Sequence, residues 1–227
     1  MHTNNDFKYK HMISILLATY NGEKYIKKSI DSIINQTYTD WELLIGFNGT
    51  TDGSKEIVAQ YNDSRIKIFD YGDDKGKSKT LNKLMKEASG NWMAIQDDDD
   101  IWLPKKLERQ FAGSEDFDVI GTQIMYINEN DDTTGKPNLS IDDSNIKEKS
   151  FRGDNQIANS SAIFKSKCAF EVGGWNESLV GIEDFDFWLN IMRKGYVFKN
   201  ISSVEVFHRL HSESNFNTKS YDISQIL

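Results

Sequence analysis

The sequence has few of the residues that would build a disulfide-stabilised or membrane-spanning protein. Cys168 is the single cysteine among 227 residues, so no intramolecular disulfide can form. No stretch reaches the length of about 20 apolar residues that spans a bilayer, and the polar start of the chain does not have the apolar segment of a signal peptide. The sequence therefore predicts a soluble protein of a reducing compartment, the cytoplasm.

Excess positive charge is also absent. The chain carries 27 Lys+Arg and 35 Asp+Glu, for a formal net charge of −8. Proteins that bind nucleic acids usually present a basic face to the phosphates, so this balance argues against a nucleic-acid partner. If the protein binds another kind of anion, a bound cation is the obvious source of attraction.

Apolar residues alternate between two periodicities over the first hundred residues. Strands are predicted at 12–19, at 41–47, around Ile66 and Ile68, and at 92–95, with helices at 26–34, from 54 to about 61, and at 78–88. Asp52 or Ser54 is placed to cap the second helix. This order is typical of βαβ units, which form a mostly parallel sheet with a nucleotide-sized crevice at the carboxyl ends of its strands.

The second half of the chain has a less regular pattern. We expect a short helix carrying Leu107 and Phe111, strands at 118–127, 157–164 and 204–210, a turn at Gly173-Gly174 and a helix at 183–194. Residues 128–150 are polar and aperiodic, which predicts a loop or flap. With 12% aromatic residues and no internal repeat, the chain suits one mixed α/β domain whose second half extends the sheet of the first.

The strongest local signal is Asp97-Asp98-Asp99-Asp100, directly after a predicted strand. Four adjacent carboxylates repel one another, and a hard divalent cation would offset that repulsion. An acidic surface loop is the alternative, but the position at the end of a central strand favours a metal site. An EF-hand calcium loop does not fit, because Ile101 and Trp102 occupy its fifth position and its glycine position.

Other nucleotide-binding signatures are absent. The first strand runs into Ala18-Thr19-Tyr20-Asn21-Gly22, and neither a Gly-x-Gly-x-x-Gly loop nor a Gly-x-x-x-x-Gly-Lys-Ser/Thr loop follows it. Tyr20 could stack on a base at the strand tip, although simple packing explains a tyrosine there as well.

A second acidic group, Glu183-Asp184-x-Asp186, opens a predicted helix. Acidic residues in a first helical turn complement the helix dipole without any catalytic role, and on these residues alone that interpretation is favoured. Asp184 would otherwise suit a general base toward a hydroxyl. His208 and His211 follow near the end of the chain, where they are either structural or able to complete a metal shell.

Together these segments resemble glycosyltransferase family 2, whose members are inverting enzymes of the GT-A fold. The similarity begins with ISILLATYNGEKYIKKSIDSIINQTYTDWELLI and continues with FNGTTDGS, with QDDDDIWLPKKLE, which resembles the family's Asp-x-Asp segment, and with GGWNESLVGIEDFDFWLNIMRKGY, which resembles its acceptor-side Glu-Asp motif. It covers about residues 12–212, and four motifs in order are more specific than any single one. It implies one Rossmann-like domain over residues 1–227, with a mostly parallel mixed sheet flanked by helices. Its donor half is 12–100, its acceptor half 101–212 and its tail 213–227.

The resemblance also implies roles for individual residues. It assigns nucleotide-sugar binding to Ala18, Tyr20, Asn48, Asp97 and Asp98, metal binding to Asp99, Asp97 and His211, the catalytic base to Asp184, and the acceptor side to Glu183 and Trp188. Asn48 stands where relatives carry an Asp that holds the base edge, with uracil as the default base. The implied cofactor is Mn²⁺ or Mg²⁺.

The activity implied is metal-dependent transfer of a sugar, with inversion, from a nucleoside-diphosphate sugar to a hydroxyl of a saccharide or lipid-linked acceptor. A role in surface polysaccharide or glycan synthesis follows from the same resemblance, with peripheral association at the inner face of the membrane through partners or the acceptor. Two alternatives stay open, a sugar nucleotidyltransferase and a non-catalytic nucleotide-sugar-binding module. The first would need a basic, glycine-rich loop for a triphosphate, which the sequence does not show.

Overall fold

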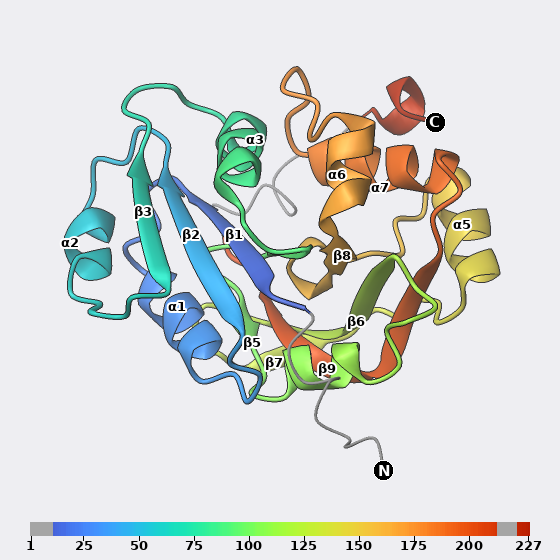
Figure 1. Ribbon diagram of the computed structural model, residues 1–227, viewed down its shortest axis with the longest axis horizontal. Helices are drawn as coiled ribbons and strands as arrows, with labels where there is room; N and C mark the ends of the chain where they lie inside the picture. Colours follow the sequence, from blue (N-terminus) through green and yellow to red (C-terminus); the bar gives the residue numbers. More distant parts are fainter. Residues whose placement is uncertain (1–10, 213–221) are drawn as a thin grey trace, which may run out of the picture.

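Strands and helices alternate over the first half of the computed structural model, which describes residues 11–212 and 222–227. The elements are β1 (Ile13–Thr19), α1 (Ile26–Ile34), β2 (Trp41–Phe47), α2 (Ser54–Val58), β3 (Ile66–Asp70), α3 (Lys77–Glu87) and β4 (Trp92–Ile95). β1 pairs in parallel with both β2 and β4, and β2 pairs in parallel with β3. The predicted βαβ arrangement is confirmed for this half (Figure 1).

The second half adds further strands to the same sheet. Its elements are β5 (Ile101–Trp102), α4 (Lys106–Phe111), β6 (Val119–Ile127), β7 (Thr133–Gly135), α5 (Asp143–Phe151), η1 (Asn159–Ser161), β8 (Ile163–Lys165), α6 (Ser166–Val172), α7 (Glu183–Arg193), β9 (Phe198–Arg209) and η2 (Ile223–Gln225). The strand order is β3-β2-β1-β4-β8-β6-β9-β5, and β7 pairs with β6. β8 is antiparallel to both of its neighbours, whereas β6 and β9 are parallel. The sheet is therefore mixed, with its all-parallel part in the first half.

Helices cover both faces of the sheet, and this explains why the central strands are apolar on both sides. Ile15 and Leu17 of β1 belong to one buried cluster with Ile30 of α1. Leu16, between them, belongs to the cluster of the opposite face with Leu84 of α3. In Figure 1, α1 and α2 lie beside the parallel strands, while α6 and α7 lie over the second half.

The prediction of a loop at 128–150 is wrong, because this segment contains β7 and α5. Asp142 caps α5, since its side chain accepts a hydrogen bond from the backbone N–H of Asn145. α5 buries only Ile146 and Ser150 and packs against α7 and β9. A nine-residue helix with so small a buried face has almost no apolar periodicity, which is why the sequence pattern did not reveal it.

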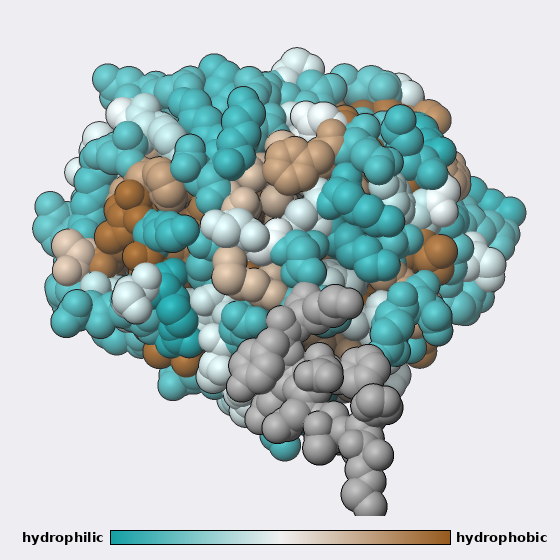
Figure 2. Space-filling model, viewed as in Figure 1, coloured by the Kyte–Doolittle hydropathy of each residue, from teal (hydrophilic) through white to brown (hydrophobic). Residues whose placement is uncertain are grey.

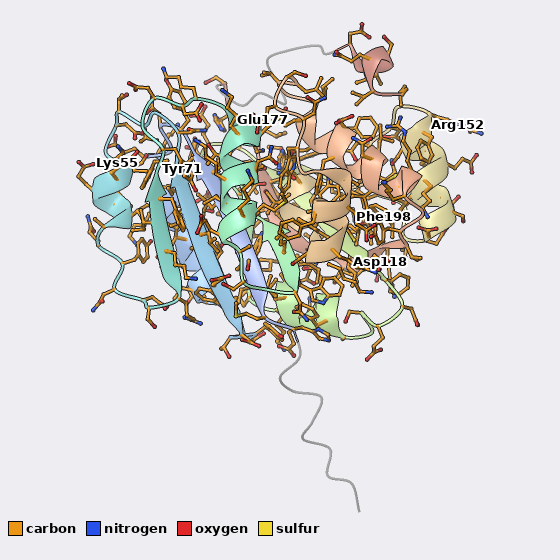
Figure 3. The ribbon with its side chains drawn as sticks, turned by 45° about the horizontal axis from the view of Figure 1, so that its top comes forward. Lys55, Tyr71, Asp118, Arg152, Glu177 and Phe198 are labelled. Atoms are coloured by element: carbon orange, nitrogen blue, oxygen red, sulfur yellow. The ribbon has the colours of Figure 1, made fainter. Side chains whose placement is uncertain are left out.

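Other boundaries also differ from the predictions. The expected strand at 157–164 is a short 3₁₀ helix, η1, followed by β8, and β9 begins at Phe198 rather than Val204. β5 and α6 were not predicted. Figure 3 labels Asp118, just before β6, and Phe198, where the parallel pairing of β6 with β9 starts. β9 therefore pairs with β6 from Phe198 to Arg209, over the whole length of β6.

The surface in the view of Figure 2 is mostly hydrophilic, with an apolar area where Figure 1 draws β2 and β3. β3 is an edge strand of the sheet, and its Ile68 is exposed. Within residues 11–212 and 222–227, no helix has the length and apolar character needed to cross a membrane. Of the predicted tail, residues 213–221 lie outside the described part, whereas Ile226 is buried against the core cluster of α7.

Candidate active site

The carboxyl ends of β1, β2 and β4 meet at one edge of the sheet. Tyr20, Asn48 and Asp97 follow these strands closely, and a cleft of about 1180 Å³ lies there. Every predicted site residue except Trp188 lines this cleft. The structure thus brings together side chains from both halves of the chain, at the place where open α/β sheets bind ligands.

Trp188 has no exposed surface and does not reach the cleft. Its ring packs edge-to-face against Phe164, with 5.5 Å between the centroids, and against Phe187, at 4.9 Å. Trp188 lies on the inward face of α7, so its expected place on the acceptor side is wrong. Its role is to fill the core beneath β8.

The outer end of the cleft offers a flat ring and an unpaired acceptor. Tyr20 is 51% exposed, and Nζ of Lys75 lies 5.3 Å from the centre of its ring. Asn48 is buried, and its Oδ1 atom has no hydrogen-bond partner among the described residues. Ala18, one residue before the end of β1, is partly buried and lines the same cleft. Such a site can stack a base and accept one hydrogen bond from it.

Asp97 and Asp98 have different partners although they are adjacent. Nζ of Lys77 lies 2.7 Å from Oδ1 of Asp97, whose Oδ2 accepts a hydrogen bond from the hydroxyl of Ser160. Asp98 accepts a hydrogen bond from the hydroxyl of Thr19. It also lies so close to Gly22 that a Cβ atom there would collide with its carboxylate. A glycine at this position therefore lets Asp98 keep its contact with Thr19.

The end of β9 holds the other two acids of the run. His211 Nε2 lies 2.9 Å from Oδ2 of Asp99, and His208 Nδ1 lies 3.0 Å from Oδ2 of Asp100. Arg209 is fully buried, donates its backbone N–H to Asp100 and donates its Nε–H to the backbone oxygen of Asp99. The contribution of Arg209 was missed, because the sequence singled out only His208 and His211, on either side of it, as candidates to join this loop.

Burial and mutual repulsion raise the pKa of two carboxyl groups in the run. Burial, followed by the charge of Asp99, raises the pKa of Asp98 to about 7. Burial and Asp100 raise the pKa of Asp99. Asp97 behaves differently, because the neighbouring ammonium of Lys77 outweighs burial and lowers its pKa. A cation bound to the run would relieve the cost of ionising Asp98 and Asp99.

The donor atoms suit a hard divalent cation shared with a substrate. In the described part of the chain, no three His, Cys, Asp or Glu side chains are already arranged to hold a metal ion. Mg²⁺ is commonly bound by only one or two carboxylates together with substrate phosphates, and Mn²⁺ takes similar oxygen ligands. Asp99, Asp97 and His211 supply donor atoms to this cleft, and a metal held there would take its remaining ligands from a diphosphate.

Asp184 enters the cleft from the first turn of α7, opposite the aspartate run. Its Oδ2 lies 3.3 Å from Nζ of Lys77, and its buried Oδ1 has no hydrogen-bond partner among the described residues. Burial raises its pKa to about 7, with Glu183 adding to the rise and Lys77 opposing it. A carboxylate that titrates near neutral pH and has an unsatisfied oxygen can accept a proton from a substrate hydroxyl.

Glu183 also lines the cleft, and its Oε2 is buried without a partner among the described residues. Asp186 points elsewhere and accepts a hydrogen bond from Asn190 on the same helix. Lys77 was missed by the sequence analysis, because a lysine at a helix start carries no chemical signature. Its two partners are visible only once the chain has folded.

A sequence profile described as Glycosyl transferase family 2 matches residues 14–170, which is more than half of the chain. The chain belongs to glycosyltransferase family 2. Among its curated relatives is the O-antigen biosynthesis glycosyltransferase WbnJ of Escherichia coli, which is 31% identical over 95% of this chain and 89% of the relative. The resemblance seen in the four motifs is confirmed, and the protein is a glycosyltransferase.

Solved structures confirm the GT-A fold. The structure of Staphylococcus aureus TarS in complex with UDP-GlcNAc matches 95% of this chain and 63% of its own, with a TM-score of 0.77 at 18% identity. The mannosyltransferase PcManGT from Pyrobaculum calidifontis, in complex with GDP-Man and Mn²⁺, matches 91% of this chain and 59% of its own, with a TM-score of 0.70 at 18% identity. This family 2 glycosyltransferase thus spans about three fifths of the length of these structures.

Proposed function

We propose that the protein transfers a sugar from a UDP-sugar to a hydroxyl group, with a divalent metal and with inversion at the anomeric carbon. The observation that carries this proposal is the placement of two acidic groups in one cleft. The aspartate run suits a metal with a diphosphate, and Asp184, on the other side of Lys77, suits a general base. This arrangement would bring a bound donor and an acceptor hydroxyl together.

The donor base would stack on Tyr20, whose ring is exposed at the tip of β1. Oδ1 of Asn48 would accept a hydrogen bond from the base, and the N3–H group of uracil supplies such a donor. Ala18 leaves room beside the ring, and Asp97 and Asp98 would approach the ribose and the diphosphate. TarS was crystallised with UDP-GlcNAc, which supports the choice of uracil, whereas PcManGT with GDP-Man shows that the fold takes other bases.

Asp99 would be the direct ligand of Mn²⁺ or Mg²⁺, with Asp97 and His211 beside it. Such an ion, when bound with the diphosphate, stabilises the negative charge that develops on the leaving β-phosphate. His208 and Arg209 hold the backbone and side chains of the run in place. Mn²⁺ in the PcManGT complex supports the use of a divalent metal.

Asp184 would take the proton of the acceptor hydroxyl as its oxygen attacks the anomeric carbon. Attack from the face opposite the departing diphosphate is a single displacement, which inverts the configuration of that carbon. Glu183 contributes to the raised pKa of Asp184 and so keeps the base strong enough to act near neutral pH.

The acceptor would be a saccharide or a lipid-linked saccharide. The name of WbnJ places that relative in O-antigen biosynthesis, which supports a role in surface polysaccharide synthesis for this protein. A lipid-linked acceptor would bring the protein to the inner face of the membrane.

A thermal-shift panel tests the proposed function. UDP-, GDP- and dTDP-sugars are each added with Mn²⁺ or with EDTA, and a UDP-sugar is expected to raise the melting temperature with Mn²⁺ only. The UDP-sugar that gives the largest increase is then assayed for UDP release. If no nucleotide sugar stabilises the protein, the proposal is wrong. Pyrophosphate release from UTP and a sugar phosphate would show a nucleotidyltransferase, and binding without turnover would show a binding module.

A further inference from the structure

Lys77 lies between the two acidic groups of the cleft. Its Nζ is 2.7 Å from Oδ1 of Asp97 and 3.3 Å from Oδ2 of Asp184. In the described part of the chain, Lys77 is the only hydrogen-bond partner of the Asp184 side chain, whose other oxygen is unpaired. The position of this carboxylate therefore depends on one ammonium group.

The structure holds that ammonium group near α7 by a second set of contacts. Asn82, on the same helix as Lys77, donates from Nδ2 to the backbone oxygen of Trp175 and to Oε1 of Glu177, and its Oδ1 accepts from the N–H of Trp175. Figure 3 shows Glu177 beside α3. The segment that leads into α7 is thus fixed to α3, which carries Lys77, independently of the ion pair with Asp184.

The ammonium group of Lys77 offsets the repulsion between the carboxylates around it. Asp97, Glu183 and Asp184 all line the same cleft, and three carboxylates close together repel one another. One ammonium group between Asp97 and Asp184 offsets that repulsion and keeps both side chains in the cleft. It also joins the side that would bind the donor to the side that would activate the acceptor.

We propose that Lys77 is a positioning residue that acts through Asp184. Its ammonium group pairs with Asp97 and at the same time holds the carboxylate of Asp184, the proposed base, in place. This inference rests on the proposed function, in which Asp184 is the base. A lysine that instead contacted only the donor diphosphate would affect donor binding and leave turnover intact.

Three variants separate these roles. Lys77→Met removes the ammonium group, Lys77→Arg keeps the charge, and Lys83→Met is the matched control. Lys83 lies on the same helix, pairs with Asp74 and is outside the cleft. The assay measures UDP release, with water or added saccharide as acceptor, from whichever of UDP-glucose, UDP-galactose and UDP-GlcNAc stabilises the wild type most.

Lys77→Met is expected to lower kcat about 100-fold, because a small misplacement of a reacting group costs that much. Its KM for the UDP-sugar should change less than about threefold, and Lys77→Arg should recover much of kcat. Lys83→Met should match the wild type. An unchanged kcat with a raised KM would overturn the inference, as would a Lys77→Arg variant as slow as Lys77→Met.

A double-mutant cycle on stability tests the same contact without any acceptor. Lys77→Met should lower the melting temperature, and adding Asp184→Asn should restore part of the loss, because the second change removes a carboxylate that has lost its partner. Strictly additive changes in melting temperature would contradict the coupling. A wild type that releases no UDP from any of the sugars would contradict the proposed function, while the cycle would still decide whether Lys77 and Asp184 are coupled.

Discussion

The two acidic groups of the cleft have similar composition but differ in how many neighbouring groups contact their side chains. Each of the four side chains in Asp97–Asp100 contacts a hydroxyl, an imidazole, a backbone N–H or an ammonium group contributed by other elements. Asp184, in the second group, contacts Lys77 alone among the described residues and keeps one oxygen unpaired. The first group is held on several sides, whereas the second is held at one point.

This difference indicates how similar residues can serve different chemistry. A metal site needs carboxylates that are fixed in place, and the neighbours of the run achieve this. A bound cation would favour the ionised forms of Asp98 and Asp99, whose pKa values burial raises. A general base needs an oxygen free to take a proton and a pKa near neutrality, which burial with few partners provides. The surroundings of a carboxylate, rather than its identity, decide its role.

The largest effect is expected from Asp184→Asn. An amide cannot take the proton of the acceptor, so transfer should fall by about 10²- to 10⁴-fold. Melting temperature and UDP binding with Mn²⁺ should be kept, because the amide has the size of the carboxylate and none of the proposed metal ligands is removed. The measurement is the rate of sugar transfer or UDP release, with Asp186→Asn as control, since Asp186 is absent from the cleft lining. Transfer within twofold of wild type, on the order of 0.4 kcal/mol, would remove Asp184 from the mechanism.

Asp100→Asn should weaken the metal site without removing a ligand. Asp100 is fully buried and accepts from Arg209 N–H at 2.9 Å, with His208 at 3.0 Å, so it fixes the loop that carries Asp99. Loss of such an outer partner typically lowers metal affinity about 10- to 100-fold. Titration of Mn²⁺ in the presence of UDP measures this. An unchanged Mn²⁺ affinity would show that the loop holds its shape without this contact.

The rate should depend on pH through Asp184. Burial raises its pKa to about 7, so the ionised base is lost below that pH, and kcat/KM should fall about tenfold per pH unit. Glu183→Gln removes one of the charges that raise this pKa, so its profile should move toward lower pH. Both profiles are measured as UDP release between about pH 5.5 and 8.5. This range extends roughly 1.5 pH units on either side of the expected midpoint. A flat profile would argue against a base with a raised pKa.

The smallest effect concerns stability. Burial and Asp99 raise the pKa of Asp98 from 3.8 to about 7, so the folded state favours the protonated carboxyl group. The contribution of this group to the stability of the folded protein is therefore lost as the pH rises through about 7. Each tenfold change in proton affinity corresponds to about 1.4 kcal/mol, so Asp98→Asn should melt at least a few degrees higher at pH 8 with EDTA. The gain should shrink at lower pH and vanish near the ordinary pKa of 3.8. The two test values, pH 5 and pH 8, lie roughly two pH units below and one pH unit above the raised pKa. An equal gain in melting temperature at both would point to a cause other than charge.

Local sequence features predicted the parts of the structure that depend on local chemistry. The aspartate run after β4 and the apolar stripe of α1 are visible in the chain itself, and the structure places both as expected. α5 was missed because it buries so few residues. Trp188 was misplaced because its acceptor-side role was taken from the family resemblance, whereas its apolar side chain is buried with Leu189 and Met192 of the same helix. Lys77 and Arg209 were missed because their partners are far away in sequence.

The most direct test is a calorimetric titration of UDP with Mn²⁺ into the wild type, Asp99→Ala and Asp184→Asn. It asks whether one acidic group binds the metal and the nucleotide while the other acts only in the transfer step. Asp99→Ala should lose the Mn²⁺-dependent part of UDP binding, because it removes the direct metal ligand. Asp184→Asn should bind UDP like the wild type and yet fail to turn over a UDP-sugar. Equal loss of UDP binding in both variants, or full binding in Asp99→Ala, would contradict the account.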